Sequence, residues 1–461
     1  MNVGDTICAI ATPPGEGGIG IIRLSGEKAI DIASAVFVGS GGRTVCDYKT
    51  HTLHHGELRA PDTSARIDEV LVAVMKAPRS YTCEDVVEFH CHGGPLVLRL
   101  GLEVLIRSGA RLAEPGEFTK RAFLNGRLDL AQAEAVIDLI QARSQTGLRV
   151  ALEQLRGALS DELGRIREGL TRLLVEIEAG IDFSDEGITF ISPQALAAGI
   201  EKVAERVERL IRTAEDGRIL REGVTAALVG RPNVGKSSLL NALARADRAI
   251  VTPIPGTTRD VLEEFVNVRG IPVRLQDTAG LRETQDIVEL EGVRRTHDAL
   301  ARAELVLVVL DGSMPLDPED RRTLELLQEK SAVLVVNKAD LLPRVEPADF
   351  KGFAGPRRTV WTSATTGAGL DELRDAIRDT VLTQGLEPSE GVLITHLRHR
   401  SALERAKTSL DQARVSVRRH MAAECIAADL RVAINAIGEI IGETTTDDIL
   451  DRIFKEFCIG K

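Results

Sequence analysis

A stretch of eight residues has the types and spacing of a phosphate-binding loop. Residues 230–237 read GRPNVGKS, which fits the pattern G-x-x-x-x-G-K-[ST]. Gly230 and Gly235 let the backbone curl so that its N–H groups point inward around a phosphate. In such a loop Lys236 reaches the β- and γ-phosphates, and Ser237 ligates Mg²⁺. The loop therefore predicts binding of a nucleoside triphosphate together with Mg²⁺.

Further short motifs follow the loop in a fixed order and indicate which base is bound. In residues 337–340, NKAD, the Asp340 carboxylate can accept hydrogen bonds from N1–H and the exocyclic amine of guanine, a pair that adenine lacks. Residues 277–280, DTAG, can hold Mg²⁺ through water and sense a γ-phosphate, while Thr258 can complete the Mg²⁺ shell. We therefore predict GTP binding. The predicted nucleotide-binding residues are Asn233, Val234, Gly235, Lys236, Ser237, Ser238, Thr252, Pro253, Ile254, Pro255, Gly256, Thr257, Thr258, Asp277, Thr278, Ala279, Gly280, Asn337, Lys338, Asp340, Ser363 and Ala364.

The residue that would position the attacking water is not obvious. Ras-like GTPases use a glutamine directly after the D-x-x-G motif, where this chain has Leu281, which cannot orient water. The sequence does not identify an arginine finger. A monovalent cation bound by the Asn233 side-chain oxygen could replace one. The downstream candidates for positioning water are Arg282, Glu283, Asp286 and Glu289.

The elements that must hold these motifs alternate between short apolar runs and helical stretches. Such alternation predicts a doubly wound α/β domain over 217–380. Helical spacing precedes this domain and resumes after residue 385, so the domain looks inserted between two parts of one helical domain, 121–216 and 381–461. Residues 1–120 are expected to be mixed α and β. The expected strands of the inserted domain are 224–229, 273–276, 305–310, 332–336 and 359–362.

Composition limits the class of protein. The net charge of −11 argues against a broad basic face for nucleic acid, and 3% aromatic residues disfavour base-stacking platforms. Six scattered cysteines without C-x-x-C spacing are typical of a reduced, cytosolic protein. With no signal-peptide pattern and no membrane-length apolar run, we expect a cytoplasmic protein that does not enter a membrane.

Three polar clusters have both functional and structural interpretations. Cys83, His90, Cys91 and His92 fit no zinc pattern, and packing is favoured over a metal site. The histidines at 51, 54 and 55 are expected in a solvated loop. The densest basic region is either a surface that faces a nucleic acid or a solvated helix face, and comprises Arg398, Arg400, Arg405, Arg418, Arg419 and Arg431.

Five short segments outside the nucleotide motifs have a recognisable pattern: ATPPG at 11–15, HGGP at 92–95, PGEF at 115–118, LDLAQAE at 128–134 and FCIGK at 457–461. With these segments and the nucleotide motifs, the sequence resembles the MnmE (TrmE) family of tRNA modification GTPases over essentially its whole length. The closing FCIGK is the most specific part, because related ribosome-assembly GTPases do not end this way. The resemblance implies an N-terminal tetrahydrofolate-binding, aminomethyltransferase-like α+β domain (1–120) that forms a homodimer, an all-α domain, and an inserted Ras-like P-loop GTPase domain.

The resemblance also implies a reaction and a set of partners. The family acts with the flavoprotein MnmG, as a heterotetramer, to add an aminomethyl or carboxymethylaminomethyl group to C5 of the wobble uridine of certain tRNAs. The implied one-carbon source is 5-formyltetrahydrofolate or another tetrahydrofolate. K⁺ would activate GTP hydrolysis by pairing the GTPase domains. The alternative function is a ribosome-assembly GTPase acting as an RNA-binding switch.

Site residues carry over by position. Glu289 would organise the attacking water, with Arg282 as the second catalytic candidate, and Cys458 is either a thiol at the modification site or a small apolar residue docked on the helical core. Some relatives have lysine at the position of Arg127, which keeps the charge but not the planar fork. The implied ligand sets are Ser237 and Thr258 for Mg²⁺, Asn233, Thr252, Ile254 and Thr257 for K⁺, and Arg23, Glu88, Arg127 and Lys461 for the folate.

Overall fold

The computed structural model describes residues 4–183, 191–246, 265–277, 303–325, 330–350, 358–382, 391–444 and 446–461. These residues form two compact units. The first holds the described residues of 1–137 and 441–461, and the second holds those of 138–440. No helix among the described residues is long and apolar enough to cross a membrane.

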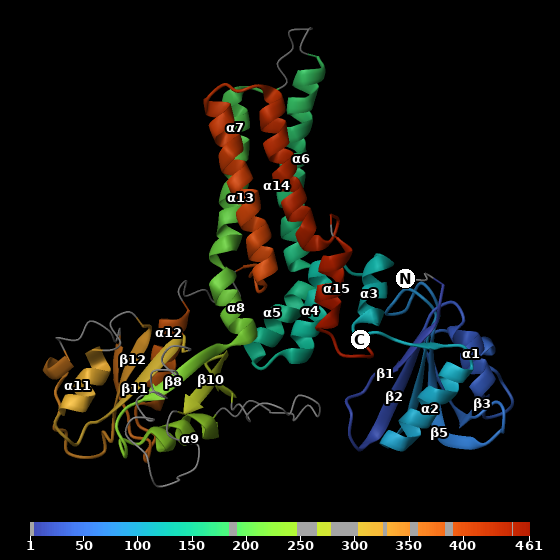
Figure 1. Ribbon diagram of the computed structural model, residues 1–461, viewed down its shortest axis with the longest axis horizontal. Coiled ribbons are helices and arrows are strands. Elements are labelled where there is room, and N and C mark those ends of the chain that lie inside the picture. The colour runs from blue at the N-terminus through green and yellow to red at the C-terminus, as the bar shows by residue number, and fades with distance from the viewer. Residues whose placement is uncertain are drawn as a thin grey trace. The chain divides into compact units, whose positions relative to one another are not determined.

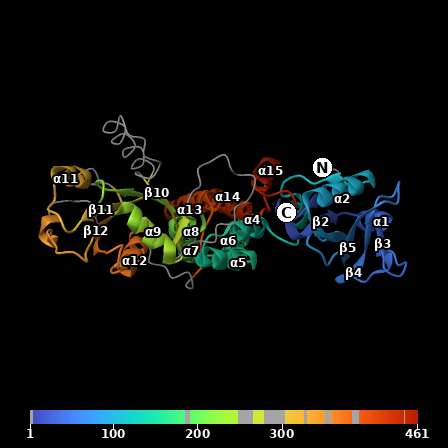
Figure 2. The same cartoon turned by 90° about the horizontal axis from the view of Figure 1, so that it is seen from below.

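A seven-stranded sheet with the order β3-β4-β5-β6-β2-β1-β7 organises the first unit. Alternate residues such as Val70, Val72 and Val74 are buried against α1 and α2, which cover one face of the sheet (Figures 1 and 2). The expected mixture of α and β is therefore confirmed. The elements are β1 (Ile7–Ile10), β2 (Gly17–Ser25), α1 (Ala29–Val36), β3 (Phe37–Gly39), η1 (Val45–Asp47), β4 (Thr52–Arg59), β5 (Arg66–Met75), β6 (Val86–Gly93), α2 (Pro95–Arg107), β7 (Arg111–Leu112), α3 (Glu117–Leu124), α4 (Leu130–Gln141, which runs into the second unit) and α15 (Asp447–Lys455).

The solvated loop expected around the histidines is wrong for His54 and His55, which lie on β4. The alternating pattern of this strand is weak, because His54 and Gly56 share one face with the buried Leu58, while Leu53 on the other face is exposed. The strand is fixed by antiparallel pairing with β3 and β5. The His54 ring stacks on Tyr48 at 3.4 Å between centroids.

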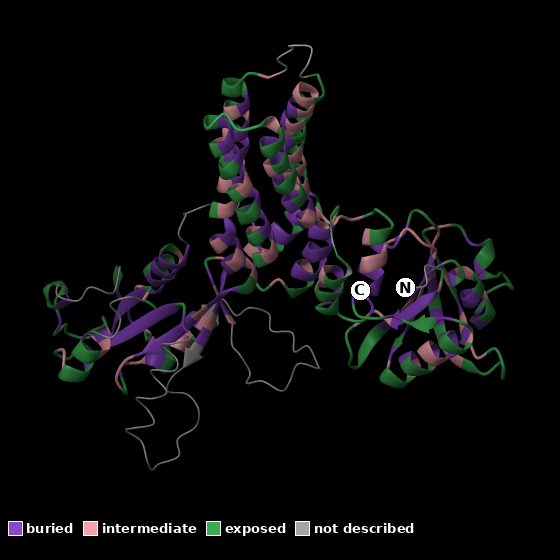
Figure 3. Ribbon diagram, turned by 45° about the horizontal axis from the view of Figure 1, so that its top comes forward, coloured by how far each residue is buried: buried purple, intermediate pink, exposed green. Residues whose placement is uncertain are grey.

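A bundle of helices makes up much of the second unit (Figure 1). Leucine and isoleucine recur every three or four residues along α6, and this stripe is buried, as the purple faces in Figure 3 show. Ser192 caps the N-terminus of α7, since its hydroxyl accepts the Ala195 N–H at 3.2 Å. The bundle helices are α5 (Gln145–Leu155), α6 (Ala158–Asp182), α7 (Pro193–Arg212), α8 (Ala214–Glu222), α13 (Leu397–Arg418) and α14 (Ala423–Ile441).

The second unit also contains a six-stranded sheet with the order β13-β12-β11-β8-β10-β9. Helices α9 and α12 pack on one face and α11 on the other, which confirms the doubly wound pattern. All five expected strands are present, the last displaced by one residue, and the sequence reading missed the short antiparallel edge strand β9. The elements are β8 (Val224–Val229), α9 (Lys236–Ala246), β9 (Phe265–Val268), β10 (Ile271–Asp277), β11 (Leu305–Asp311), α11 (Pro318–Glu325), β12 (Ala332–Asn337), η3 (Pro347–Phe350), β13 (Arg358–Trp361) and α12 (Leu370–Val381).

Candidate functional site

The phosphate-binding loop joins the end of β8 to the start of α9. Gly230 and Gly235 have φ of 148° and 99°, a region that favours glycine. A Cβ on Gly235 would overlap the side-chain amide of Asn337, and one on Gly230 would overlap the carbonyl of Val309. Both glycines are thus required by backbone conformation and by the close approach of neighbouring strands.

Lys236 is held inside the curl of the loop. Its ammonium donates hydrogen bonds to the carbonyl oxygens of Gly230 at 2.6 Å and Arg231 at 2.8 Å. The side chain is buried, whereas Ser237 beside it is exposed at the helix N-terminus. A buried cation and the positive end of the α9 dipole together suit a polyphosphate, and the exposed Ser237 hydroxyl suits a Mg²⁺ bound to it.

Asn337 connects the predicted guanine motif to the phosphate loop. Its amide nitrogen donates to the Val234 carbonyl at 2.8 Å, and its oxygen accepts the Ala364 N–H at 3.2 Å. The side chain is only 2% exposed, so these bonds are shielded from water. The structure therefore brings together the loop, the NKAD motif and the segment Ser363–Ala364, while the Asp340 carboxylate remains exposed.

Two further groups support this arrangement and were missed in the sequence. Asp311, at the end of β11, accepts a bond from Lys338 at 2.6 Å. Burial would raise the pKa of Asp311, but bonds from Lys338 and Ser313 outweigh it and hold that pKa below its ordinary value. Arg231 bonds to Asp320 at 2.9 Å, which ties the loop to α11. A polar residue at a strand end was the available signal for Asp311.

Several predicted residues lie outside the described part of the chain. Of Asp277 only the backbone, the last residue of β10, is described. The other residues that are not described include three of the four proposed K⁺ ligands, the second proposed Mg²⁺ ligand and both catalytic candidates. They are Thr252, Pro253, Ile254, Pro255, Gly256, Thr257, Thr258, Thr278, Ala279, Gly280, Arg282 and Glu289.

A second polar cluster lies in the first unit, and we call Arg23, Tyr81, Glu88, Arg127 and Lys461 the N-terminal cluster. Arg23 on β2 faces Glu88 on β6 in the ladder, and its Nε donates to Oε1 of Glu88 at 2.7 Å. The two side chains are 15% and 16% exposed. This pair is thus fixed by strand register rather than by neighbouring positions in the sequence.

Tyr81, which the sequence reading missed, lies between two arginines of this cluster. The guanidinium carbons of Arg23 and Arg127 lie 5.9 Å and 5.1 Å from its ring centroid. Its hydroxyl shares a hydrogen bond of 2.9 Å with Thr119. Burial raises the pKa of the Tyr81 phenol, so the ring stays neutral and presents an aromatic surface.

The segment 457–461 closes over the cluster. The Gly460 carbonyl accepts a bond from Arg23 Nη1 at 3.2 Å, and a Cβ on Gly460 would lie 2.6 Å from the Ile10 carbonyl. Burial and the nearby Arg23 charge lower the pKa of the Lys461 ammonium, while Glu88 acts in the opposite direction. All four residues implied for the folate, Arg23, Glu88, Arg127 and Lys461, are therefore gathered here.

Cys458 is exposed, so the interpretation that it docks on a helical core is wrong. Phe457 of this segment is buried and packs against Phe454 with ring centroids 5.5 Å apart. The Cys458 carbonyl accepts the Gly116 N–H at 3.5 Å, which holds the backbone while leaving the thiol accessible.

Four arginines of the basic region bond within the bundle. Arg398 donates to the carbonyl oxygens of Glu439 and Ile440, at 2.7 Å and 3.0 Å. Arg400, Arg405 and Arg431 pair with Glu404, Glu439 and Glu178 respectively. These contacts support the structural interpretation for this part of the basic region.

Comparison with known proteins identifies the family. Residues 130–458 match the model of the MnmE helical domain, and residues 6–127 match that of the GTP-binding protein TrmE N-terminus. The tRNA modification GTPase MnmE of Moorella thermoacetica is 50% identical over 99% of both chains, and that of Heliobacterium modesticaldum is 49% identical over 100% of both. The chain belongs to the tRNA modification GTPase MnmE family. MnmE-family membership identifies it as a GTP hydrolase in tRNA modification. The phosphate-binding loop with Lys236 and Ser237, which we call the nucleotide cradle, suits the GTP and Mg²⁺ that this activity requires.

Among solved structures, the G domain of the T. maritima FeoB iron transporter is 29% identical over 34% of this chain and 99% of its own, with a TM-score of 0.26. Aquifex aeolicus Era bound to GDP and AlF4⁻ is 28% identical over 40% of this chain and 66% of its own, with a TM-score of 0.27.

Proposed function

We propose that this MnmE-family GTPase acts with an MnmG-type flavoprotein to add an aminomethyl or carboxymethylaminomethyl group to C5 of the wobble uridine of certain tRNAs. The observation that supports this most is the N-terminal cluster. Three cationic side chains, one carboxylate and one aromatic ring converge there from distant segments of a chain whose other unit holds a nucleotide cradle. A polyanionic, aromatic one-carbon carrier needs such a combination.

A tetrahydrofolate, such as 5-formyltetrahydrofolate, fits the chemistry of the cluster. When bound it would supply the one-carbon unit of the reaction. Arg23, Arg127 and Lys461 offer positive charge to the carboxylates of a glutamate tail, and Glu88 offers acceptor oxygens to the N–H groups of a pterin. The Tyr81 ring offers a surface for stacking. The exposed Cys458 thiol lies in the segment that closes over this site and is a candidate for the modification chemistry.

For hydrolysis we propose a potassium mechanism. Asn233, Thr252, Ile254 and Thr257 would hold K⁺ against the phosphates, where its charge takes the place of an arginine finger. Ser237 and Thr258 would ligate Mg²⁺, and Glu289, assisted by Arg282, would organise water. Ordering of the loop around K⁺ would present a surface on which two GTPase domains pair, and a homodimer through residues 1–120 would keep them at high effective concentration.

The proposed function is tested by mass analysis of tRNA nucleosides from cells that lack the gene. Loss of the modified wobble uridine, restored by the intact gene but not by an Arg23→Ala variant, is the expected result. An unchanged wobble uridine would discard the proposal in favour of a ribosome-assembly switch.

The potassium mechanism has a separate test in purified protein. GTP turnover should be faster in KCl than in NaCl at equal ionic strength, and Asn233→Ala should remove the difference while GTP still binds. Equal turnover in the two salts would direct the search to an arginine supplied by a partner.

A further inference from the structure

Asp138 lies at the place where the GTPase domain (the described residues of 224–382) is joined to the helices. The first connection is α8, which ends at Glu222 directly before β8. The second is the segment 391–396, which leads from the GTPase domain into α13. Asp138 itself is near the C-terminal end of α4.

One carboxylate group holds both connections. Oδ1 of Asp138 accepts a hydrogen bond from Arg221 Nε at 2.7 Å, and Oδ2 is 2.9 Å from Nε2 of His396. The Asp138 side chain is 6% exposed, so the two bonds are largely removed from water. Burial would raise the pKa of Asp138, but His396 and Arg221 outweigh it and lower that pKa, so the group stays ionised.

The second connection is held along its length by other helices as well. Gln154 on α5 donates to the Leu393 carbonyl at 2.9 Å, and the Thr213 hydroxyl accepts the Ile394 N–H at 3.0 Å. Ile394 is fully buried, and a Cβ on Gly217 would overlap its carbonyl. This connection is thus packed against the helices and held in place by hydrogen bonds.

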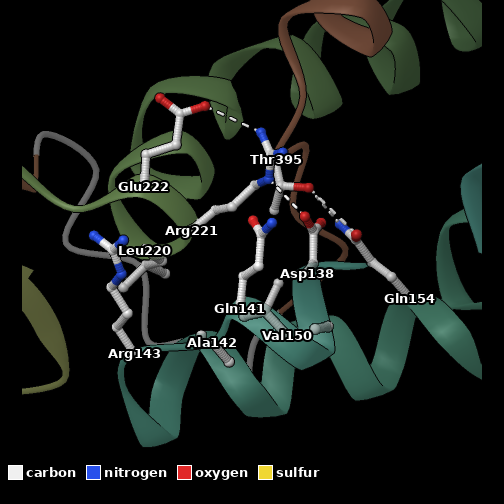
Figure 4. A pocket seen from close by; sticks show the side chains of 12 residues that line it. Asp138, Gln141, Ala142, Arg143, Val150, Gln154, Leu220, Arg221, Glu222 and Thr395 are labelled. Carbon is white, nitrogen blue, oxygen red and sulfur yellow. Dashed lines mark hydrogen bonds and ion pairs between the residues drawn. The ribbon is translucent and has the colours of Figure 1, made fainter. Parts of the chain in front are cut away.

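A cavity of about 230 Å³ adjoins these bonds. Asp138, Arg143, Arg221 and Thr395 are among the residues that line it, as Figure 4 shows. The Arg143 guanidinium carbon also lies 3.8 Å from the ring centroid of Phe265, the first residue of β9. Since β9 pairs with β10, which carries Asp277 of the Mg²⁺ motif at its end, this contact reaches the strand pair that leads to the nucleotide.

We propose that Asp138 is the positioning residue through which the nucleotide state of the GTPase domain is transmitted to the helices. A shift of the β9–β10 strand pair would push on Arg143, and the cavity gives that side chain and Arg221 room to respond. Displacing one connection alone would leave a buried carboxylate with only one of its partners, which is costly. The two connections therefore move together. This inference requires GTP binding only, and it stands whether or not the folate and MnmG proposals hold.

Hydrogen–deuterium exchange on the full chain tests the proposal, comparing the GDP state with a non-hydrolysable GTP analogue. In the wild type, exchange in peptides covering residues 145–155 and 391–396 should differ between the two states. In Asp138→Asn, an amide N–H₂ replaces one acceptor, so exchange of 391–396 should rise about tenfold and the difference between states should vanish. Binding of a fluorescent guanine nucleotide should stay within twofold of wild type. Glu153→Gln is the matched control. Glu153 lies on α5, one of the segments whose exchange is measured, but it pairs with Arg156 and its side chain is 56% exposed.

Arg221 and His396 should each account for part of the effect of Asp138→Asn on the nucleotide-dependent exchange. Arg221→Gln and His396→Gln each remove one bond, so each should lose part of the nucleotide-dependent difference, and the double variant should match Asp138→Asn. Asp138→Glu, which keeps the charge, should recover part of it. A purely structural role would raise exchange equally in both nucleotide states and preserve their difference, and that result in Asp138→Asn or in the double variant would overturn the proposal. Should Asp138→Asn fail to fold, the Arg221 and His396 variants decide the question alone.

Discussion

The nucleotide cradle and the N-terminal cluster differ in how the chain assembles them. The loop at 230–237 is one continuous turn, and its partner Asn337 lies at the end of β12. Asp311, which holds Lys338 of the NKAD motif, lies at the end of the parallel neighbour β11. In the cluster, Arg23 meets Glu88 and Gly460 across 65 and 437 residues of sequence. A site built from a strand end and its following turn leaves a signature in the sequence, whereas a site built by strand register and by docking of a distant segment leaves almost none.

The two sites also differ in how their positive charge is balanced. The Lys236 ammonium bonds to two backbone carbonyls of its own loop, which are neutral dipoles. The N-terminal cluster places Arg23, Arg127 and Lys461 around the single carboxylate among its members, Glu88. The cluster thus has more cationic than anionic side chains, which suits an anionic ligand, while the Lys236 ammonium is held by carbonyls of its own loop.

Lys236→Ala should separate the two sites most strongly. Removing the buried cation takes away charge that meets the phosphates, so GTP turnover should fall by about 10²–10³-fold. Binding of 5-formyltetrahydrofolate, measured by calorimetry, should be unchanged, since the lysine is not part of the N-terminal cluster. Equal losses of GTP turnover and of folate binding would mean that the two sites are energetically coupled.

Asp340→Asn should change which base the cradle accepts. The variant loses one acceptor for guanine, a hydrogen bond to a charged group worth about 1.5–3 kcal/mol. GTP affinity should fall by that amount while affinity for xanthosine triphosphate rises, as competition binding would measure. Unaltered GTP affinity would place base recognition elsewhere.

Gly460→Ala tests whether docking of 457–461 builds the N-terminal cluster. With φ of 96° and the Ile10 carbonyl 2.6 Å from a new Cβ, the substitution must displace the segment. The Arg23 bond to the Gly460 carbonyl should be lost, and 5-formyltetrahydrofolate affinity should fall by about 1–2 kcal/mol, with GTP turnover retained. Gly126→Ala is the control for backbone strain alone, because Gly126 has φ of 73° but open space around its Cβ. If both variants bind folate equally, the segment does not shape the site.

The difference between local and long-range assembly explains which parts of the fold could be predicted from the sequence. Five strands of the six-stranded sheet were predictable because apolar runs such as β11 (Leu305–Asp311) are buried on both faces, whereas the short edge strand β9 was missed. Strand β4 was not predictable, because its inner face carries His54 and a glycine and its outer face carries His55 beside the exposed Leu53. Asn337 was expected near the base, but its bond to the Val234 carbonyl depends on two loops meeting.

The candidate-site residues follow the same division. The types and spacing of GRPNVGKS and NKAD predicted the cradle directly. Arg23, Glu88, Arg127 and Lys461 were reached only through a resemblance, and Tyr81 was not reached at all. The bonds of Asp138 to Arg221 and His396 span 83 and 258 residues, so no local pattern could have indicated them.

The smallest expected effect concerns the charge of Lys461. Burial and the Arg23 charge lower its pKa below the ordinary 10.5, so its positive charge is lost earlier than that of a free lysine as pH rises. A folate carboxylate prefers the charged form, so affinity should weaken as pH rises through this lowered pKa, by about 1 kcal/mol. Lys461→Arg keeps its charge throughout, and its affinity should stay level over the same range. Calorimetric titration with 5-formyltetrahydrofolate from neutral to alkaline pH measures both curves, with Lys455→Arg, at an exposed position on α15, as the control that should follow wild type. If the Lys461→Arg and wild-type curves run parallel, the pH dependence belongs to another group and Lys461 does not meet the ligand.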